Sequence, residues 1–150
     1  MGNHQLSVGD ADFDGRDEIF YGAMTIDDDG RGLYKTGLGH GDAYHVSDMD
    51  PDRPGLEIYG PHESPVLYGP YGSEMHDART GEIIWGASGQ GADVGRGVAM
   101  DIDPRFRGYE AWSSRGGLFS CRGELITATR PAQMNFAVWW DGDHPDYSSS

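Results

Sequence analysis

The chain has 150 residues, enough for one ordinary domain, and its 25 acidic residues outnumber its 11 basic ones to give a formal net charge of −14. This charge argues against nucleic acid and anionic membrane as partners, and it suits a protein that binds cations. The 24 glycines indicate a turn-rich chain, and no apolar run approaches the ~20 residues of a membrane helix.

Short apolar runs bounded by Gly, Pro and Asp recur along the chain, and helical periodicity is nearly absent, which indicates strands joined by turns. The expected strands are, in chain order, Gln5–Val8, Glu18–Ala23, Gly32–Thr36, Ala43–Val46, Leu56–Gly60, Glu82–Gly86, Val98–Met100, Glu110–Ser113, Leu118–Cys121, Glu124–Ala128 and Phe136–Trp140. The single Cys121 cannot form an internal disulfide, and we expect it to be a small buried residue.

One pattern repeats along the chain: an apolar strand, Asp-x-Asp, a turn, an acid and a second apolar strand. Its copies are "LSVGDADFDGRDEIFYG" (Leu6–Gly22), "YHVSDMDPDRPGLEIYG" (Tyr44–Gly60) and "GVAMDIDPRFRGYEAWS" (Gly97–Ser113), and a fourth begins at "FAVWWDGD" (Phe136–Asp143). Repeats of roughly 40–50 residues with about four strands each predict an all-β fold of β-propeller blades. About three blades cannot close a ring, so we expect residues 1–150 to be an open, partial propeller domain from a longer protein.

The first acidic loop, "DADFDGRDE", places mutually repelling carboxylates around a glycine. Alternate residues of a tight loop can point their oxygens at one centre, and hard oxygen ligands favour Ca²⁺. The twelfth position is Tyr21 rather than a glutamate, so the loop is not an EF-hand. The expected Ca²⁺ ligands are the side chains of Asp10, Asp12, Asp14 and Glu18 and the carbonyl oxygen of Arg16. The alternative is a solvated acidic turn capped by its own Asx hydrogen bonds.

Two further loops, "DMDPDRPGLE" and "DIDPRFRGYE", share one spacing from first Asp to closing Glu and predict two more Ca²⁺ sites. The expected ligands are Asp48, Asp50 and Glu57 in one loop and Asp101, Asp103 and Glu110 in the other. The third-carboxylate position holds Asp52 in the former and Arg105 in the latter, which predicts weaker binding around Asp101. The unfinished loop at Asp141 and Asp143 lacks a closing acid, and we assign no metal to it.

Four stretches of the chain are long and specific: "GNHQLSVGDADFDGRDEIFYGAMTIDDDGRGLYKTGLGHGDAYHVSDMDPDRPGLE", "DARTGEIIWG", "DVGRGVAMDIDPR" and "NFAVWWDGD". Together they resemble the rhamnogalacturonan lyases of polysaccharide lyase family 11. The resemblance implies an eight-bladed propeller that binds several Ca²⁺ ions, of which this chain matches the middle blades. It also implies cleavage of the rhamnose–galacturonic acid backbone of pectin, rhamnogalacturonan I, by β-elimination.

β-Elimination removes the C5 proton of a galacturonate and expels the sugar on O4, so it needs a base, assistance to the leaving oxygen and positive charge at the uronate carboxylate. By the resemblance, His4 in "GNHQL" and His40 in "GLGHGD" match cleft positions implicated in metal binding. Arg96 in "DVGRG" matches a cleft position where its guanidinium could clamp the uronate. These three residues are the catalytic candidates, and Arg96 and His45 are candidates for substrate binding. The structural alternatives are histidines hydrogen-bonded in strand-end turns and a surface ion pair of Arg96.

Two other features have mainly structural interpretations. The run Asp27–Asp29 before Gly30 favours a hairpin turn, with contact to sugar or metal as the alternative. Three tryptophans are more typical of a core than of sugar-binding platforms: Trp85, Trp139 and Trp140.

Two functional hypotheses follow. The first is a fragment of a calcium-dependent rhamnogalacturonan lyase, inactive in isolation because part of the cleft is missing. Its pectic substrate implies a secreted or periplasmic protein, although this chain carries no recognisable signal peptide. The second is a non-catalytic Ca²⁺-binding propeller segment for carbohydrate binding or adhesion. In both cases the open blade edges predict self-association of the isolated chain.

Overall fold

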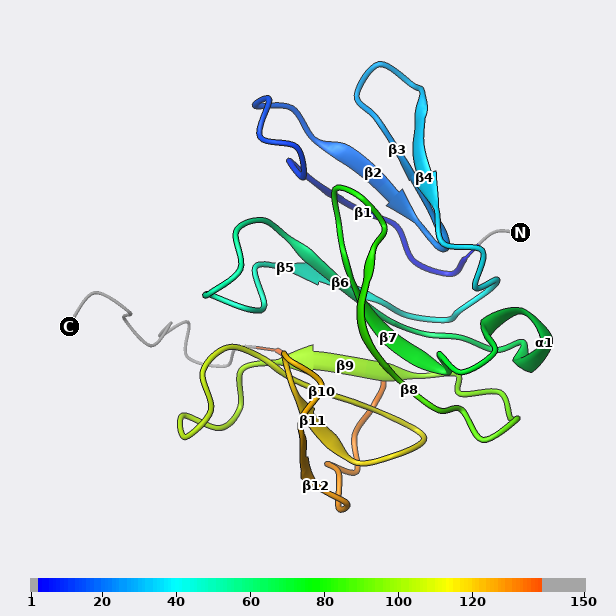
Figure 1. Cartoon of the computed structure of the whole chain (residues 1–150), viewed down its shortest axis with the longest axis vertical. Helices are drawn as coiled ribbons and strands as arrows, with labels where there is room; N and C mark the ends of the chain where they lie inside the picture. Colours follow the sequence, from blue (N-terminus) through cyan, green and yellow to red (C-terminus); the bar gives the residue numbers. More distant parts are fainter. Residues whose placement is uncertain (1–2, 139–150) are drawn as a thin grey trace.

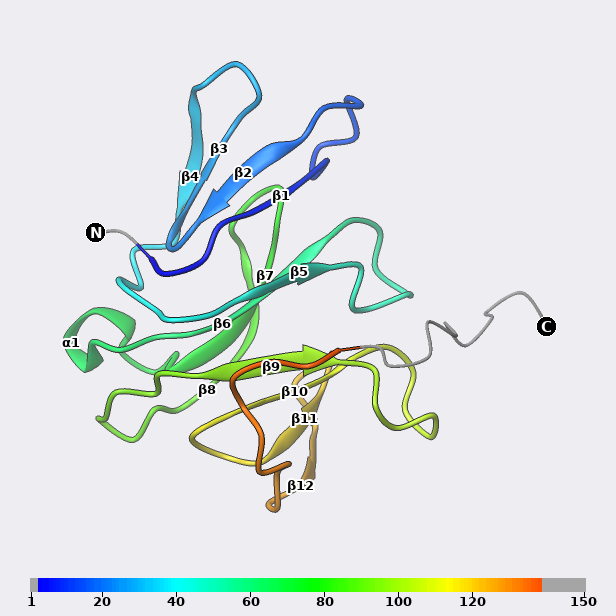
Figure 2. The same ribbon diagram turned by 180° about the vertical axis from the view of Figure 1, so that it is seen from behind.

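A computed structural model describes residues 3–138, which form three four-stranded antiparallel sheets. Figures 1 and 2 show the sheets following one another along the longest axis of the molecule, in the order of the sequence. Within each sheet, strands that are neighbours in space are neighbours in sequence, so every connection is antiparallel. The expected all-β fold is confirmed. Among the described residues, no helix is long and apolar enough to cross a membrane.

The strand bounds are short and regular. The first sheet consists of β1 (Ser7–Gly9), β2 (Glu18–Tyr21), β3 (Met24–Ile26) and β4 (Gly32–Lys35). The second sheet consists of β5 (His45–Ser47), β6 (Glu57–Pro61), β7 (Ser73–Asp77) and β8 (Ile83–Ala87). The third sheet consists of β9 (Gly97–Met100), β10 (Glu110–Ser113), β11 (Leu118–Ser120) and β12 (Leu125–Thr127). A single-turn helix, α1 (Pro65–Tyr68), lies between β6 and β7.

The hydrophobic core lies between the sheets. Phe20 of the first sheet packs with Tyr44 and Ile58 at the junction with the second sheet. Tyr59 and Met75 of the second sheet pack with residues of the third. Because side chains alternate between the two faces of a strand, Ile58 and Tyr59 of β6 point to opposite faces, and the second sheet packs against both of its neighbours.

The interpretations of Cys121 and Trp85 as core residues are confirmed. Cys121 is a buried free thiol, and burial raises its pKa to about 11. Trp85 packs against the core with its ring stacked on Tyr59 at 5.9 Å between centroids, and its Nε1–H donates to the carbonyl of Cys121 at 2.8 Å. Trp139 and Trp140 lie outside the described residues.

Three elements were not expected from the sequence: β3, β7 and α1. Strand β3 is short and runs directly into the Asp27–Asp29 turn. Strand β7 reads "SEMHD", which is too polar to suggest a buried strand, yet Glu74 and His76 are both buried there because they bond to each other. The expected strand Phe136–Trp140 is wrong for residues 136–138, which are exposed and outside any sheet; its last two residues lie beyond the described part of the chain.

Candidate functional site

Each acidic loop connects the first two strands of one sheet, so the three loops occupy equivalent places in the fold. The closing glutamates Glu18, Glu57 and Glu110 begin β2, β6 and β10 and are fully buried. Each turns one carboxylate oxygen back to accept backbone N–H groups of its own loop, from Ala11 at 2.6 Å in the first case. Met49 and Asp50 donate in the second loop, and Ile102 and Asp103 donate in the third. The spacing of the repeat therefore places one charged oxygen inside each loop.

The first loop offers an oxygen cluster suited to a cation. Oxygens of Asp10, Asp12 and Glu18 lie within 4.8 Å of one another. The second carboxylate oxygen of Glu18, Oε1, is buried and has no hydrogen-bond partner among residues 3–138. Burial, with added repulsion from Asp12 and Asp10, raises the pKa of Glu18. An unpaired buried carboxylate beside two others is stabilised by a hard divalent cation, so this donor set fits Ca²⁺.

Asp14 is not part of that cluster, and the Arg16 carbonyl stays a predicted ligand. The Asp14 carboxylate accepts the backbone N–H of Arg16 at 2.9 Å, and the Arg16 guanidinium pairs with Asp28 at 2.7 Å. Asp10 also accepts backbone N–H groups within the loop, from Phe13 at 2.8 Å and from Gly15 at 3.1 Å. The Asx-capped turn that the sequence left as an alternative is therefore present, and it coexists with the oxygen cluster.

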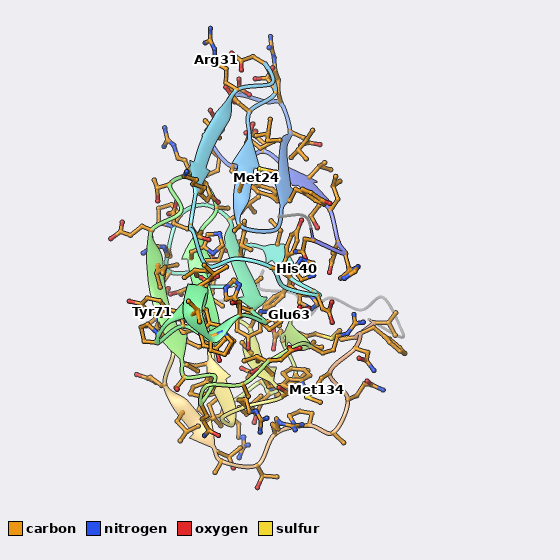
Figure 3. The ribbon with its side chains drawn as sticks, turned by 90° about the vertical axis from the view of Figure 1, so that its right-hand side faces the viewer. Met24, Arg31, His40, Glu63, Tyr71 and Met134 are labelled. Atoms are coloured by element: carbon orange, nitrogen blue, oxygen red, sulfur yellow. The ribbon has the colours of Figure 1, made fainter. Side chains whose placement is uncertain are left out.

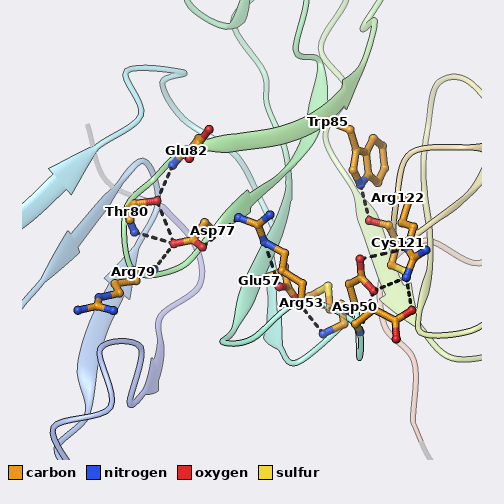
Figure 4. Close-up of polar contacts among 12 residues, drawn as sticks. Asp50, Arg53, Glu57, Asp77, Arg79, Thr80, Glu82, Trp85, Cys121 and Arg122 are labelled. Carbon is orange, nitrogen blue, oxygen red and sulfur yellow. Dashed lines mark hydrogen bonds and ion pairs between the residues drawn. The ribbon is translucent and has the colours of Figure 1, made fainter.

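In the second loop, the carboxylates form ion pairs with two arginines (Figure 4). Arg122, from the β11–β12 turn of the third sheet, donates to both carboxylate oxygens of Asp50 at 3.2 Å and also pairs with Asp52. Arg53 Nε lies 3.7 Å from Glu57 Oε1, and its Nη2 donates to Asp77 at 3.1 Å. Burial opposes ionisation of Asp50, but Arg122 overcomes it and lowers the Asp50 pKa. Guanidinium groups thus supply the positive charge expected from Ca²⁺ at Asp50 and Glu57, while the pKa of Asp48 is raised by partial desolvation and by Asp50.

The third loop combines both arrangements. Arg105 binds Asp103 through Nε at 2.8 Å and Nη2 at 2.5 Å, and these bonds lower the Asp103 pKa to about 2. Glu110 Oε1 is buried without a hydrogen-bond partner in the described part of the chain, as Glu18 Oε1 is in the first loop. Burial raises the Glu110 pKa, and Asp101 and Asp103 raise it further. A cation beside Asp101 and Glu110 would satisfy that oxygen.

A second cluster forms at the opposite ends of the strands. His4, His40 and Arg96 each precede the first strand of one sheet, so the fold brings three segments far apart in sequence to one face. The rings of His4 and His40 meet edge to face with centroids 5.0 Å apart. His4 Nε2 lies 3.4 Å from one oxygen of Asp42, and Arg96 Nε lies 3.4 Å from the other. Ligand atoms of His4, His40 and Asp42 lie within 4.8 Å of one another and could hold a metal ion.

Asp42 and Glu63 belong to this cluster and were not predicted from the sequence. His40 Nε2 lies 3.5 Å from Glu63 Oε1, and the Glu63 backbone N–H donates to the His40 carbonyl at 2.9 Å. Burial and the nearby Asp42 carboxylate raise the Glu63 pKa. Figure 3 shows His40 and Glu63 side by side on one face of the molecule. Asp42 could have been found from its place in "GLGHGD", whereas nothing in the sequence around Glu63 marks it.

The cluster borders an open pocket of about 800 Å³. Asn3, Glu63 and Asp93 line it together with the two histidines, and Ser64 and Pro65 complete its wall. The pocket is wide enough for sugar residues, and its lining is acidic and imidazole-rich.

His45 lies elsewhere. It sits on β5, where its Nε2 is 3.3 Å from the carbonyl of Gly97, and burial lowers its pKa. It lines a different pocket, with Ala99 and Tyr109. Its proposed contact with substrate stays a prediction. The Asp27–Asp29 run forms the expected hairpin turn between β3 and β4, with the Asp27 N–H donating to the Arg31 carbonyl at 2.7 Å.

Comparison with known proteins gives consistent results. The family profile described as rhamnogalacturonan lyase family 11, C-terminal domain, matches residues 1–146. The chain is 53% identical to the rhamnogalacturonan exolyase YesX of Bacillus subtilis over 95% of this chain and 24% of that protein. It is also 53% identical to the rhamnogalacturonan endolyase YesW of the same organism, over 95% of this chain and 22% of the relative.

Solved structures agree with the sequence comparisons. The crystal structure of YesW is similar with a TM-score of 0.89 and 52% identity, and that of a rhamnogalacturonan lyase from Bacillus licheniformis with a TM-score of 0.88 and 55% identity. Each alignment covers 95% of this chain and 24% of the solved chain. The chain therefore spans about a quarter of the length of the relatives it matches.

Proposed function

Because the chain belongs to rhamnogalacturonan lyase family 11, we propose that it forms one part of the substrate cleft of a lyase that cleaves the rhamnogalacturonan I backbone by β-elimination. The observation that carries the proposal is that His4 and His40 line one open pocket, while Asp42 contacts His4 and holds Arg96 beside them. A purely adhesive propeller has no need for paired imidazoles and a guanidinium around a shared carboxylate.

Arg96 has the chemistry to bind the uronate. Its side chain is about half exposed (48%), and the carboxylate of Asp42 holds it through Nε. A guanidinium at the uronate carboxylate offsets the negative charge that grows there as the C5 proton leaves. An imidazole is a suitable group to receive that proton near neutral pH, and His4 and His40 both lie beside the pocket.

His4, His40 and Asp42 are also suited to hold a divalent cation, because neutral imidazole and carboxylate are common ligands for such ions. A cation bound there would polarise the uronate carboxylate and increase the acidity of the C5 proton. Asp42 then has two roles in this chain: it orients Arg96, and it offers an oxygen to the cation.

The acidic loops have a separate, structural role in this proposal. Calcium bound at the oxygen cluster of Asp10, Asp12 and Glu18 would neutralise the buried Glu18 carboxylate. At Asp101 and Glu110 the argument for calcium rests on the buried oxygen of Glu110 that has no hydrogen-bond partner in the described part of the chain. Binding at Asp48, Asp50 and Glu57 would have to displace Arg53 and Arg122, so we propose weaker calcium binding there. A pectic substrate further implies export from the cell.

Replacement of Arg96 tests the proposed cleft. In a full-length protein that carries this segment, Arg96→Lys should lower kcat/KM on rhamnogalacturonan by about 100-fold, because an ammonium cannot reproduce a two-point clamp on a carboxylate. The measurement is the ultraviolet absorbance of the unsaturated uronate product. Arg31→Lys, at an exposed hairpin tip, is the matched control and should leave the rate unchanged. Equal rates for the two variants would contradict the role of Arg96.

The second candidate function, for the isolated chain, is carbohydrate binding without cleavage. The observation in its favour is that the chain covers only about a quarter of its relatives. We expect the 150-residue chain alone to give no rise in product absorbance, and a rise would show that this segment contains the whole active site.

A further inference from the structure

A buried group of ionisable residues lies behind the cleft and takes no part in the proposed chemistry. Glu74 on β7 is 1% exposed and accepts hydrogen bonds from two histidines. His76 Nδ1 lies 3.0 Å and 2.9 Å from the two carboxylate oxygens, and His62 Nε2 lies 3.3 Å from Oε1. Burial opposes ionisation of Glu74, but His76 and His62 overcome it and lower the Glu74 pKa. The group is therefore a buried, charge-assisted network.

This network is inaccessible to substrate. The adjoining cavity has a volume of about 10 Å³, room for one water molecule at most. A buried carboxylate costs free energy unless it is paired and hydrogen-bonded, so its presence in β7 calls for a structural or positioning role.

His62 connects the network to the cleft. It immediately precedes Glu63, whose backbone N–H holds the His40 carbonyl at 2.9 Å. The His62 carbonyl accepts the Val94 N–H at 3.1 Å, two residues before Arg96. The pair His62–Glu63, which we call the hub, is therefore hydrogen-bonded to the segment that carries His40 and to the segment that leads to Arg96.

The packing around the hub is tight. A Cβ on Gly41, between His40 and Asp42, would lie 2.2 Å from the carbonyl oxygen of Pro61, which precedes the hub. The His40–Asp42 segment thus lies directly on the hub backbone. A change in the position of His62 should therefore reach the His40 segment through this close packing and the Arg96 segment through the Val94 hydrogen bond.

We propose that Glu74 is a positioning residue of the cleft, which sets the relative placement of His40, Glu63 and Arg96 by anchoring the His62 side chain. This inference goes beyond the proposed function, which assigns no role to Glu74, His62 or His76. Its functional consequence rests on that proposal, but its structural part does not.

Amide hydrogen exchange on the 150-residue chain tests the structural part. Glu74→Gln removes the negative charge and replaces one acceptor oxygen by an NH2 donor, so the hydrogen bonds from His76 and His62 weaken and the hub loosens. We expect the amides of Glu63 and Val94 to exchange about tenfold faster. The amide of Tyr109, bonded to the Met49 carbonyl at the other end of the sheets, serves as the internal reference.

Tyr34→Phe is the matched control. The Tyr34 ring packs edge-on against His76, and its hydroxyl donates to the Ala78 carbonyl at 2.9 Å. The variant therefore removes a hydrogen bond next to the network but leaves the bonds of Glu74 to His62 and His76 in place. It should leave the exchange of Glu63 and Val94 unchanged. If Glu74→Gln does not fold, His62→Leu provides the second variant, since it keeps the Glu74–His76 pair and removes the link to the hub. Unchanged exchange of both amides in the folded variant would overturn the proposal.

Cobalt titration tests the functional consequence. Co²⁺ binding at His4, His40 and Asp42, followed by its visible absorption and abolished in His40→Ala, should weaken about tenfold in Glu74→Gln and remain unchanged in Tyr34→Phe. Equal weakening in both variants would show that Glu74 has only a general structural role. If the unaltered chain binds no Co²⁺, the proposed metal site fails, and the exchange rates alone decide the role of Glu74.

Discussion

The buried glutamates that close the acidic loops all accept backbone N–H groups of their own loop, but they differ in whether positive charge lies beside them. Glu57 lies beside Arg53, whereas Glu18 and Glu110 each keep one oxygen without a hydrogen-bond partner among the described residues. An unpaired buried carboxylate oxygen is costly, which makes these two positions the places where a cation would stabilise the fold most.

Glu18→Gln should separate two effects of the Glu18 charge on stability: the cost of burying it and the calcium binding that it allows. Without calcium the variant should be as stable as the original chain or more stable, because burial already disfavours the charged form of Glu18. With calcium at about 100 times its Kd the original chain should gain about 2.7 kcal/mol, and the variant should lose most of that gain. Thermal unfolding in EDTA and in calcium measures both quantities. Glu82→Gln, an exposed position, is the control; an equal calcium response in all three proteins would contradict the site.

The direction of the pKa shifts predicts how stability depends on pH in the absence of calcium. The pKa values of Glu18, Glu57 and Glu110 are raised by burial, so the folded state binds protons more tightly than the unfolded state does. Their contribution to stability therefore decreases as the pH rises through the folded pKa, and it is fully present below the ordinary value of 4.5. The pKa values of Asp50 and Asp103 are lowered, and their contribution is lost as the pH falls below the ordinary 3.8.

Stability in EDTA should consequently increase on acidification from neutral pH and decrease again in stronger acid. Calcium should remove the increase, because the closing glutamates must be ionised to bind it. Denaturant unfolding as a function of pH, with and without calcium, checks both statements. A stability that falls steadily on acidification in EDTA would show that the buried glutamates are not protonated more readily in the folded state.

At the scale of elements, the cleft depends on the approach of one loop to the end of β6. The segment that carries His40 and Asp42 passes over Pro61 with no space for a side chain at Gly41, so a glycine is required there by close approach. By contrast, Gly32 at the start of β4 has no atom within 4 Å of a built Cβ and an ordinary φ.

Gly41→Ala should therefore destabilise the chain by about 1–3 kcal/mol and displace His40 from Asp42. Gly32→Ala is the control and should change stability by less than about 0.5 kcal/mol. Chemical denaturation measures the loss of stability, and Co²⁺ affinity at the histidine cluster measures the displacement of His40. Unchanged Co²⁺ affinity in a destabilised Gly41→Ala variant would show that the close approach of Gly41 to Pro61 does not position His40 in the cluster.

At the scale of the whole molecule, the first sheet leaves one face without a partner in the described structure. Val8, Ile19 and Ile26 form a cross-strand row on that face, and Val8 is 55% exposed. Met24 and Leu33 extend the same apolar surface. The opposite face, with Phe20 and Thr25, is buried against the second sheet. A sheet with apolar residues on both faces, only one of which is buried, is expected to associate through the other.

The 150-residue chain should accordingly self-associate, and Ile19→Glu should weaken this association by about 2 kcal/mol because it places a charge at the centre of the face. Sedimentation velocity over a concentration series measures it. Val66→Glu is the control, since Val66 is 92% exposed and belongs to α1 rather than to the first sheet. A monomeric original chain, or equal effects of the two substitutions, would contradict this role for the face.

The sequence by itself determined the all-β class, nearly every strand and the three equivalent acidic loops. These features depend on local sequence. In each loop, Asp-x-Asp forms a turn, and the closing Glu accepts hydrogen bonds from the backbone N–H groups of that same turn. Strand β7 could not be predicted in this way, because its polar residues are paired with each other in the core and no local hydrophobic pattern reveals such pairing.

Only the tertiary structure decided which charges meet. Arg122 reaches Asp50 from the turn of another sheet, and Asp42 joins His4 to Arg96 across three sheets. The electrostatic energy of a carboxylate depends on distance and burial rather than on position in the chain. For that reason the same acidic motif binds arginine guanidinium groups in the loop of Asp50 and Glu57, whereas Glu18 and Glu110 in the other two loops each have a buried oxygen that a cation could bind.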